Sequence, residues 1–323
     1  MSRSEPGAPV PNADGVPAAD AVRATHADVE AWRTELSNWG RWGPDDRLGT
    51  LNLIDDARRA AAVRLVRTGR AVSCSRPLPT RPAIDNPFPV THTIVQTRDP
   101  NSAQDHLGIA SHGFSTTHLD ALCHVSHGGL SYNGVPAAPR GALLETTLGM
   151  GEMRDGVIGR GILLDVAGTD AQGGPGYLEA GTAVAPEALD AAAELAGIRV
   201  EAGDLVLVRT GRWALRDAAG AWSPTRRLAG LDARCLPWLH RHDVALLGSD
   251  GVSDAIPSPV EGEPEPIHDL AIVTLGLPLL DNLDLERLAV ACRDLGRWEF
   301  LLVVAPLIVA NGTGSPANPI ALF

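Results

Sequence analysis

The sequence predicts an α/β protein. From residue 71 onward, short apolar or alternating runs are bounded by Gly, Pro or Asp, a pattern typical of buried strands. Segments with the apolar periodicity of helices lie between these runs. The order of strands and helices follows no strict βαβ repeat, so the pattern alone indicates the class and not the topology.

The N-terminal region is predicted to be a tail followed by two short helices. Residues 1–25 are rich in Pro, Ala, Gly and Asp without periodicity, and we expect them to be a disordered, mobile tail. Residues 27–40 and 55–69 have helical patterns, and each range ends with a glycine. Trp39 and Trp42 indicate a packed loop between the two helices.

Six strands and three further helices are predicted in the rest of the chain. Apolar or alternating runs indicate strands over residues 71–78, 89–96, 159–168, 203–213, 244–250 and 300–309. Helical patterns cover residues 186–197, 231–243 and 284–296. The glycine-rich segment 312–319 lacks the strand-to-helix context and the lysine of a nucleotide-binding loop, so we predict no nucleotide site there.

The composition is that of a globular protein. With 323 residues, of which 44% are hydrophobic, the chain is long enough to bury a large core. No run of about 18 apolar residues is present, and the start Met-Ser-Arg-Ser-Glu-Pro lacks the apolar core of a signal peptide. We therefore expect a cytoplasmic protein with no membrane partner.

Charge and cysteine usage narrow the class of function. A net charge of −12 and the lack of any Lys/Arg-rich run disfavour a nucleic-acid partner, because phosphate binding needs a basic surface. The four cysteines are scattered without C-x-x-C spacing, which argues against a thiolate zinc site and fits a reducing compartment. We predict that they are buried thiols.

The segment from Ser111 to Asn133 contains four of the ten histidines and is the strongest functional signal. His118 and Asp120 are two residues apart, so on a strand they project from the same face. Imidazole nitrogen and carboxylate oxygen are suitable ligands for Zn²⁺ or Mn²⁺. His124 follows four residues after Asp120 and shares its face if the intervening residues begin a helix. We predict that the three side chains converge on one cavity.

A second part of the site is expected far along the chain. His268 follows a Pro/Glu-rich loop and opens an apolar run, which places it at the mouth of a buried element. Asp281 lies at the end of that run, before the helical pattern of residues 284–296. Asp281 could be a ligand, but Asp-Asn before a helix is also a good N-cap, and the residues alone favour the cap.

Two further residues have competing interpretations. Asp250 follows an apolar run, where site residues of sheet proteins often lie, but Ser-Asp-Gly is a strong turn signal and the turn is favoured. Cys123 could act as a nucleophile with His124 as its base. Adjacent residues generally point in different directions, which disfavours that pair.

Together these residues resemble the longer members of the metal-dependent cyclase family, which includes bacterial kynurenine formamidase, isatin hydrolase and trans-dienelactone hydrolase. The resemblance runs from about residue 38 to the C-terminus and starts with NWGRWGPDDRLGTLNLI, which is similar to the opening segment of the longer members. It is carried by the T-H-x-D-x-x-x-H motif from Thr117 to His124, by His268, and by Asp281 before N-L-D-L.

The resemblance implies a swivelling β/β/α fold with a mixed β-sheet and flanking helices, in a single hydrolase domain over residues 26–323. It also implies one or two divalent ions, Zn²⁺ or Mn²⁺, bound by His118, Asp120, His268 and Asp281. His124 is then the general acid and base. A small-molecule substrate and a homo-oligomer are implied as well.

Two positions depart from the family pattern. The pattern has another ligand histidine four residues before His118, and this chain has Phe114 there. His112, two residues further back, is a candidate extra ligand or substrate contact. The smaller formamidases carry Glu where this chain has Asp281, which is one methylene shorter, so the number of ions stays open.

We therefore predict a hydrolase that uses metal-activated water to cleave a C–N or C–O bond of an amide, N-formyl, imide or lactone, as an arylformamidase does. A bound ion lowers the pKa of water from about 16 towards 7 and polarises a carbonyl. His124 would transfer the proton. Two alternatives are an aromatic polyketide cyclase, whose ion stabilises an enolate, and a non-enzymatic binding protein.

Overall fold

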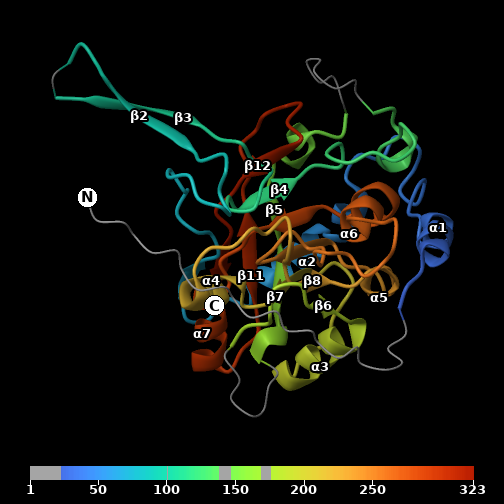
Figure 1. Ribbon diagram of the computed structural model, residues 1–323. Helices are drawn as coiled ribbons and strands as arrows, with labels where there is room; N and C mark the ends of the chain where they lie inside the picture. Colours follow the sequence, from blue (N-terminus) through green and yellow to red (C-terminus); the bar gives the residue numbers. More distant parts are fainter. Residues whose placement is uncertain (1–22, 100, 138–146, 169–175) are drawn as a thin grey trace, which may run out of the picture.

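A nine-stranded mixed sheet forms the centre of the computed structural model, which describes residues 23–99, 101–137, 147–168 and 176–323 (Figure 1). The strands of this sheet are β1 (Ala71–Ser73), β4 (His118–Asp120), β5 (Val157–Asp165), β7 (Leu205–Arg209), β9 (Leu246–Ser249), β10 (Leu279–Asp281), β11 (Glu299–Val304), β12 (Gly314–Pro316) and β13 (Ile320–Leu322). Their order is β1-β13-β11-β5-β7-β9-β10-β4-β12.

Strand direction changes across this sheet. The four central strands β5, β7, β9 and β10 run parallel to one another. On one side β11 is added antiparallel to β5, followed by β13 and β1, each antiparallel to its neighbour. On the other side β4 is added antiparallel to β10, and β12 antiparallel to β4. The sheet is therefore mixed, with helices packed around it, as the family resemblance implies.

The helices begin and end at residues with clear local signals. Their bounds are α1 (His26–Glu35), α2 (Asp56–Val63), α3 (Pro186–Ala196), α4 (Arg212–Ala219), α5 (Cys235–Arg241), α6 (Pro266–His268) and α7 (Glu286–Leu295), with a π-helix over Asp269–Leu275. Thr25 caps α1 by accepting from the Asp28 N–H, and the Asp28 side chain caps Thr25 in return. Gly197 ends α3 with a φ of 64°, which glycine adopts without strain.

Alternate side chains of the central strands fill two apolar layers. Val206 and Val208 of β7 pack in one core cluster, together with residues of α3 and α5 such as Leu189 and Trp238. Leu205 and Leu207 of the same strand pack in the other cluster, together with residues of α7. The central sheet is thus buried on both faces, which explains why its strands appear as continuous apolar runs.

Several predicted elements are shorter than their sequence patterns. The first helix ends at Glu35, because the chain then turns so that the Asn38 N–H donates to the Thr274 carbonyl at 3.0 Å. The strand predicted over residues 203–213 ends at Arg209, and α4 begins at Arg212. Residues 1–22, most of the predicted tail, lie outside the described residues.

The prediction of a buried strand over residues 89–96 is wrong. Strand β2 (Thr91–Gln96) pairs with β3 (Ala103–Gly108) in a hairpin that projects from the body of the protein (Figure 1). Every residue of β2 is exposed. Alternation of apolar and polar residues is the same whether or not a second layer covers the strand, so the sequence pattern could not reveal this difference.

Two short elements complete the fold. Strands β6 (Ala183–Val184) and β8 (Gly230–Leu231) form a small parallel ladder. Within the described ranges, no helix is both long enough and apolar enough to cross a membrane.

Candidate metal centre

The short strand β4 carries His118 and Asp120 into the interior. It lies between β10 and β12, with His118 opposite Asp281 on one side and Gly314 opposite Asp120 on the other. His118 Nε2 is 3.4 Å from Asp120 Oδ1. The structure therefore brings this pair together on one side of the strand, as the two-residue spacing predicts.

His124 reaches the same carboxylate through a turn, and the helix predicted after Asp120 is absent. The Ala121 N–H donates to the Thr313 carbonyl, and the His124 N–H donates to the Ala121 carbonyl, both at 2.9 Å. These hydrogen bonds direct the chain into a turn, which leaves His124 Nε2 4.0 Å from Asp120 Oδ2. The predicted convergence is found, but its predicted local cause is wrong.

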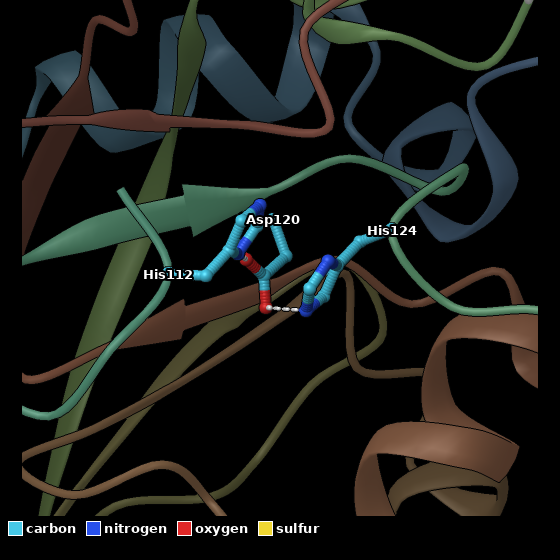
Figure 2. Close-up of side chains that lie close together, drawn as sticks. All are labelled: His112, Asp120 and His124. Atoms are coloured by element: carbon cyan, nitrogen blue, oxygen red, sulfur yellow. Dashed lines mark ion pairs between the residues drawn. The ribbon is translucent and has the colours of Figure 1, made fainter. Parts of the chain in front are cut away.

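His112 also lies at this carboxylate. Its Nδ1 is 3.0 Å from Asp120 Oδ1, and its ring stacks on that of His124 with centroids 3.7 Å apart (Figure 2). Gly314 makes room for it, because a Cβ at that position would lie 2.6 Å from His112 Cε1. The loop before β4 thus brings a histidine to Asp120, even though Phe114 occupies the position where the family that this chain resembles has a ligand histidine.

His268 and Asp281 approach from the opposite part of the chain. His268, the last residue of α6, has its Nε2 3.3 Å from Asp281 Oδ2 and 3.8 Å from Asp120 Oδ2. Asp281 is the last residue of β10, and α7 begins only at Glu286. The N-cap interpretation of Asp281 is therefore wrong, and the Asp284 carboxylate instead accepts the Glu286 N–H at 3.3 Å.

Two residues that sequence reasoning missed support this second group. Asp254 Oδ2 accepts from His268 Nδ1 at 2.7 Å, and the same carboxylate accepts the N–H groups of Ile267 and His268. Ser253, at a φ of 62°, donates its hydroxyl to Asp281 Oδ1 at 2.9 Å. Asp254 lies 14 residues before His268, and no strand or helix spacing joins them.

Three of the four imidazoles are anchored through one ring nitrogen. His118 Nδ1 bonds to the Thr116 carbonyl at 2.8 Å, and His112 Nε2 bonds to the Thr313 hydroxyl at 2.8 Å. His268 is anchored by Asp254 in the same way. Such partners fix the orientation of metal-ligating histidines and leave the second nitrogen for the ion. In the part of the chain that the structure describes, His124 has no such anchor.

The Asp120 carboxylate is the least satisfied polar group of the site. Its side chain is fully buried, and neither oxygen accepts a hydrogen bond from any described residue. Burial by itself would raise the pKa of this carboxyl, but the charge of His118, the close approach of His112 and the charge of His124 outweigh burial and hold the pKa below its usual range. A buried carboxylate without donors is costly unless a cation accompanies it.

Burial and neighbouring charge also shift the pKa values around Asp120. Burial lowers the pKa of His124 to about 4, with Asp120 opposing the shift. Burial would also lower the pKa of His268, but its contacts with Asp254 and Asp281 raise it well above the usual value. Burial raises the pKa of Asp254.

The residues present fit a divalent cation. Ligand atoms of His112, Asp120 and His124 lie within 4.8 Å of one another, and so do those of His118, Asp120 and Asp281. Both groups share Asp120, whose two unsatisfied oxygens could each face an ion. A donor set of imidazole nitrogen and carboxylate oxygen suits Zn²⁺ or Mn²⁺ and not the thiolate-preferring ions.

A separate buried network holds the loop that carries His112. Asn282, at a φ of 55°, donates its amide to the carbonyls of Gly113 and Thr116 at 2.6 and 3.3 Å. Arg212 donates to Asn282 Oδ1 at 2.5 Å and to the Phe114 carbonyl.

Asp250 holds the backbone of Arg212 in place and does not join the cluster at Asp120. Its carboxylate accepts the N–H groups of Thr210, Gly211 and Arg212 and the Thr210 hydroxyl. Asp250 is therefore neither a ligand nor a simple turn residue, because it anchors the start of α4.

Comparison with known proteins agrees with this fold and site. The family model Cyclase, described as "Putative cyclase", matches residues 58–254. The crystal structure of a novel cyclase is 30% identical, with a TM-score of 0.79, and the alignment covers 89% of this chain and 99% of that chain. No match is found among the curated proteins.

More distant solved structures share the fold. An isatin hydrolase bound to the product analogue thioisatinate is 20% identical, with a TM-score of 0.54, over 79% of this chain and 92% of that chain. Isatin hydrolase A from Ralstonia solanacearum is 21% identical, with a TM-score of 0.53, over 78% of this chain and 91% of that chain. The fold and the His/Asp cluster thus define a protein of the cyclase class.

The match to the family model and the similarity to the novel cyclase extend over most of the chain. This chain belongs to the cyclase family.

Proposed function

We propose that this protein is a divalent-metal-dependent hydrolase that cleaves a C–N or C–O bond of an amide, N-formyl, imide or lactone substrate. The observation that carries the proposal is the Asp120 carboxylate, which is fully buried, accepts no hydrogen bond from the described residues and is surrounded by four imidazoles. The isatin hydrolases that share the fold support hydrolysis as the class of reaction.

The candidate ligands gather around Asp120. Its carboxylate would hold one or two ions together with His118, His268 and Asp281. His112, whose Nδ1 lies 3.0 Å from Asp120 Oδ1, is a candidate further ligand. A bound Zn²⁺ or Mn²⁺ supplies Lewis acidity, which makes a bound water a nucleophile at neutral pH and polarises the substrate carbonyl.

His124 is suited to move the proton. Its side chain is 25% exposed, whereas Asp120 is fully buried, so the ring borders both the carboxylate and the solvent-accessible side. In the described ranges neither of its nitrogens is held by a hydrogen bond, in contrast to the other three histidines. Nε2 can therefore accept a proton from the attacking water and return it to the leaving nitrogen or oxygen.

The direct test is metal content by inductively coupled plasma analysis of protein purified without chelators. Wild-type protein should hold at least one divalent ion per chain. His118→Ala and Asp120→Ala should each lose most of it together with turnover, because loss of one ligand frees the others to move. His127→Ala is the matched control, since this half-exposed neighbour contacts Asp269 rather than Asp120.

Metal-free wild-type protein, or full metal content in both ligand variants, would reject the proposal. Mass spectrometry of the product then separates hydrolysis from ring formation. Hydrolysis gives product that is heavier than the substrate by one water molecule, or two products whose masses sum to that value. Turnover without the addition of water would instead support the polyketide cyclase alternative.

A further inference from the structure

A compact cavity borders the metal centre at His112. It has a volume of about 290 Å³ and extends from His112 to the segments 84–88 and 224–225. The same His112 ring lies 3.0 Å from Asp120, so one side chain separates the cavity from the ligands. Small-molecule pockets usually measure about 300–1,000 Å³, so this cavity suits a small group next to the bond that reacts.

The walls of the cavity are largely apolar. They include Ile84, Pro87, Phe88, Ala110, Phe114 and Pro224. Phe88 is 77% exposed and Ile84 is 61% exposed, although both are large apolar side chains. Apolar side chains that gather around a cavity and remain in contact with water mark a surface that a ligand would cover.

Four polar side chains of the wall are already paired within the protein. Asp85 forms an ion pair with Arg216, and the Asn86 amide donates to the Arg81 carbonyl at 2.8 Å. The Ser115 hydroxyl donates to the Asp85 carbonyl, and the Thr225 hydroxyl pairs with that of Ser223 at 2.9 Å.

The paired wall disfavours a charged occupant. The one carboxylate among the lining residues is neutralised by Arg216, and no Lys or Arg is among them, so the described lining has no unpaired carboxylate, ammonium or guanidinium group. Moving a charged group out of water without a partner is costly.

We propose that this cavity binds an uncharged apolar group of the substrate, attached next to the bond that is cleaved. The inference rests on the proposed hydrolase function and adds the chemical class of the group that the enzyme selects. Substrates with a charged group in this position are excluded by the paired, apolar wall.

Phe114 sets the limit of the cavity. Phe114 and Thr225 line both the cavity and a neighbouring groove of about 540 Å³ along residues 256–265. The Phe114 backbone is held by Arg212, and the preceding Gly113 carbonyl accepts from Asn282 at 2.6 Å. Phe114 is thus a fixed partition, and the residue that replaces the family's histidine determines substrate length in this chain.

Fluorine NMR titration of the metal-loaded protein tests the cavity directly. The probes are fluorobenzyl alcohol and fluorobenzylammonium, which share one ring and differ in charge. The alcohol should bind about tenfold more tightly, a difference of about 1.4 kcal/mol. Ala110→Trp should weaken binding of the alcohol by about tenfold, because the indole fills the cavity.

Leu195→Trp is the control, since it adds the same side chain at an exposed position of α3. It should bind the alcohol as the wild type does. Phe114→Ala provides a second test, which remains valid if the Ala110→Trp variant does not fold. It joins the cavity to the groove, so the preference for a fluorobiphenyl methanol over fluorobenzyl alcohol should rise by about tenfold.

Three results would overturn the inference, namely equal binding of the two probes, unchanged binding in Ala110→Trp, or an unchanged length preference in Phe114→Ala. Metal content measured on the same samples keeps the two proposals apart. Metal-free wild-type protein that still binds the alcohol in the cavity would reject the hydrolase proposal alone. If the protein holds metal and Ala110→Trp binds the alcohol as tightly as the wild type does, only the cavity inference is rejected.

Discussion

Two buried aspartates differ in the hydrogen-bond donors around them, and this difference distinguishes a candidate metal site from a structural cluster. Asp120 and Asp250 are both fully buried. Asp250 accepts three backbone N–H groups and a hydroxyl, all from residues 210–212. Asp120 accepts none from the described residues and faces imidazole nitrogens instead. Burial is equal at the two positions, so it is the missing donors that mark a ligand site.

Replacing each aspartate by asparagine should separate the two roles most strongly. Asp120→Asn removes a carboxylate that could contact an ion through either oxygen, so metal content should fall nearly to zero while the stability of chelator-treated protein changes by less than about 1 kcal/mol. Asp250→Asn weakens charge-assisted hydrogen bonds and should destabilise the protein by about 1–3 kcal/mol. Urea unfolding and metal analysis of both variants measure this.

The reverse result would break the comparison. Metal retained in Asp120→Asn, together with a large loss of stability, would make Asp120 a structural residue. Unchanged stability in Asp250→Asn would show that its hydrogen bonds to the start of α4 contribute little.

His124 tests whether every side chain around Asp120 is a ligand. Because the structure shows no anchor for its ring, we expect His124→Ala to keep wild-type metal content and to lose about 10²–10⁴ in turnover, the usual contribution of a positioned acid or base. Steady-state kinetics and metal analysis on the same preparation give both numbers. Metal loss as large as in His118→Ala would make His124 a ligand, and proton transfer would then need another group.

Asp254 tests how much the orientation of one imidazole matters. Asp254→Asn weakens the bond to His268 Nδ1, so metal affinity should fall about 10- to 100-fold, as expected for the partner of a metal-ligating histidine. Competition with a chelating dye measures the affinity. Asp232→Asn is the control, because Asp232 is also buried but interacts with Arg234 and not with the site. Equal affinities in the two variants would contradict the assignment.

Gly314 should give the smallest effect. A methyl group there would lie 2.6 Å from His112 Cε1, and the imidazole must shift away from Asp120, so Gly314→Ala should reduce metal affinity only a few-fold. Gly113→Ala is the matched control, since a Cβ at Gly113 meets no atom within 4 Å. If metal affinity fell equally in both variants, the cause would be a general disturbance of the backbone around the site and not the displacement of the His112 ring.

Much of the candidate site follows from local spacing. The two-residue separation of His118 and Asp120 determines which way their side chains point on a strand, so it could be predicted. The role of Asp281 is harder to predict, because an N-cap and a metal ligand have the same sequence context as long as the start of α7 is unknown. Asp254 could not be found at all, since its partner His268 is brought to it only by the packing of α6.

The fold shows the same division between local and long-range information. The runs that became β5, β7 and β9 are buried on both faces and are clear in the sequence. Strands β12 and β13 are three residues each, and the sequence does not predict them, because only their pairing with β4 and with β1 and β11 defines them. The homo-oligomer and the cytoplasmic location stay predictions.

The projecting hairpin β2–β3 has a consequence for engineering the molecule. Among the described residues, the hydrogen bonds and ion pairs of residues 91–108 stay within the hairpin itself. The flanking segments 84–88 and 110–116 are fastened to the body instead, through Arg216, Arg212 and Asn282. The hairpin is therefore a suitable site for inserting a tag or a second domain. Such an insertion should leave the structure of the cavity beside His112 unchanged.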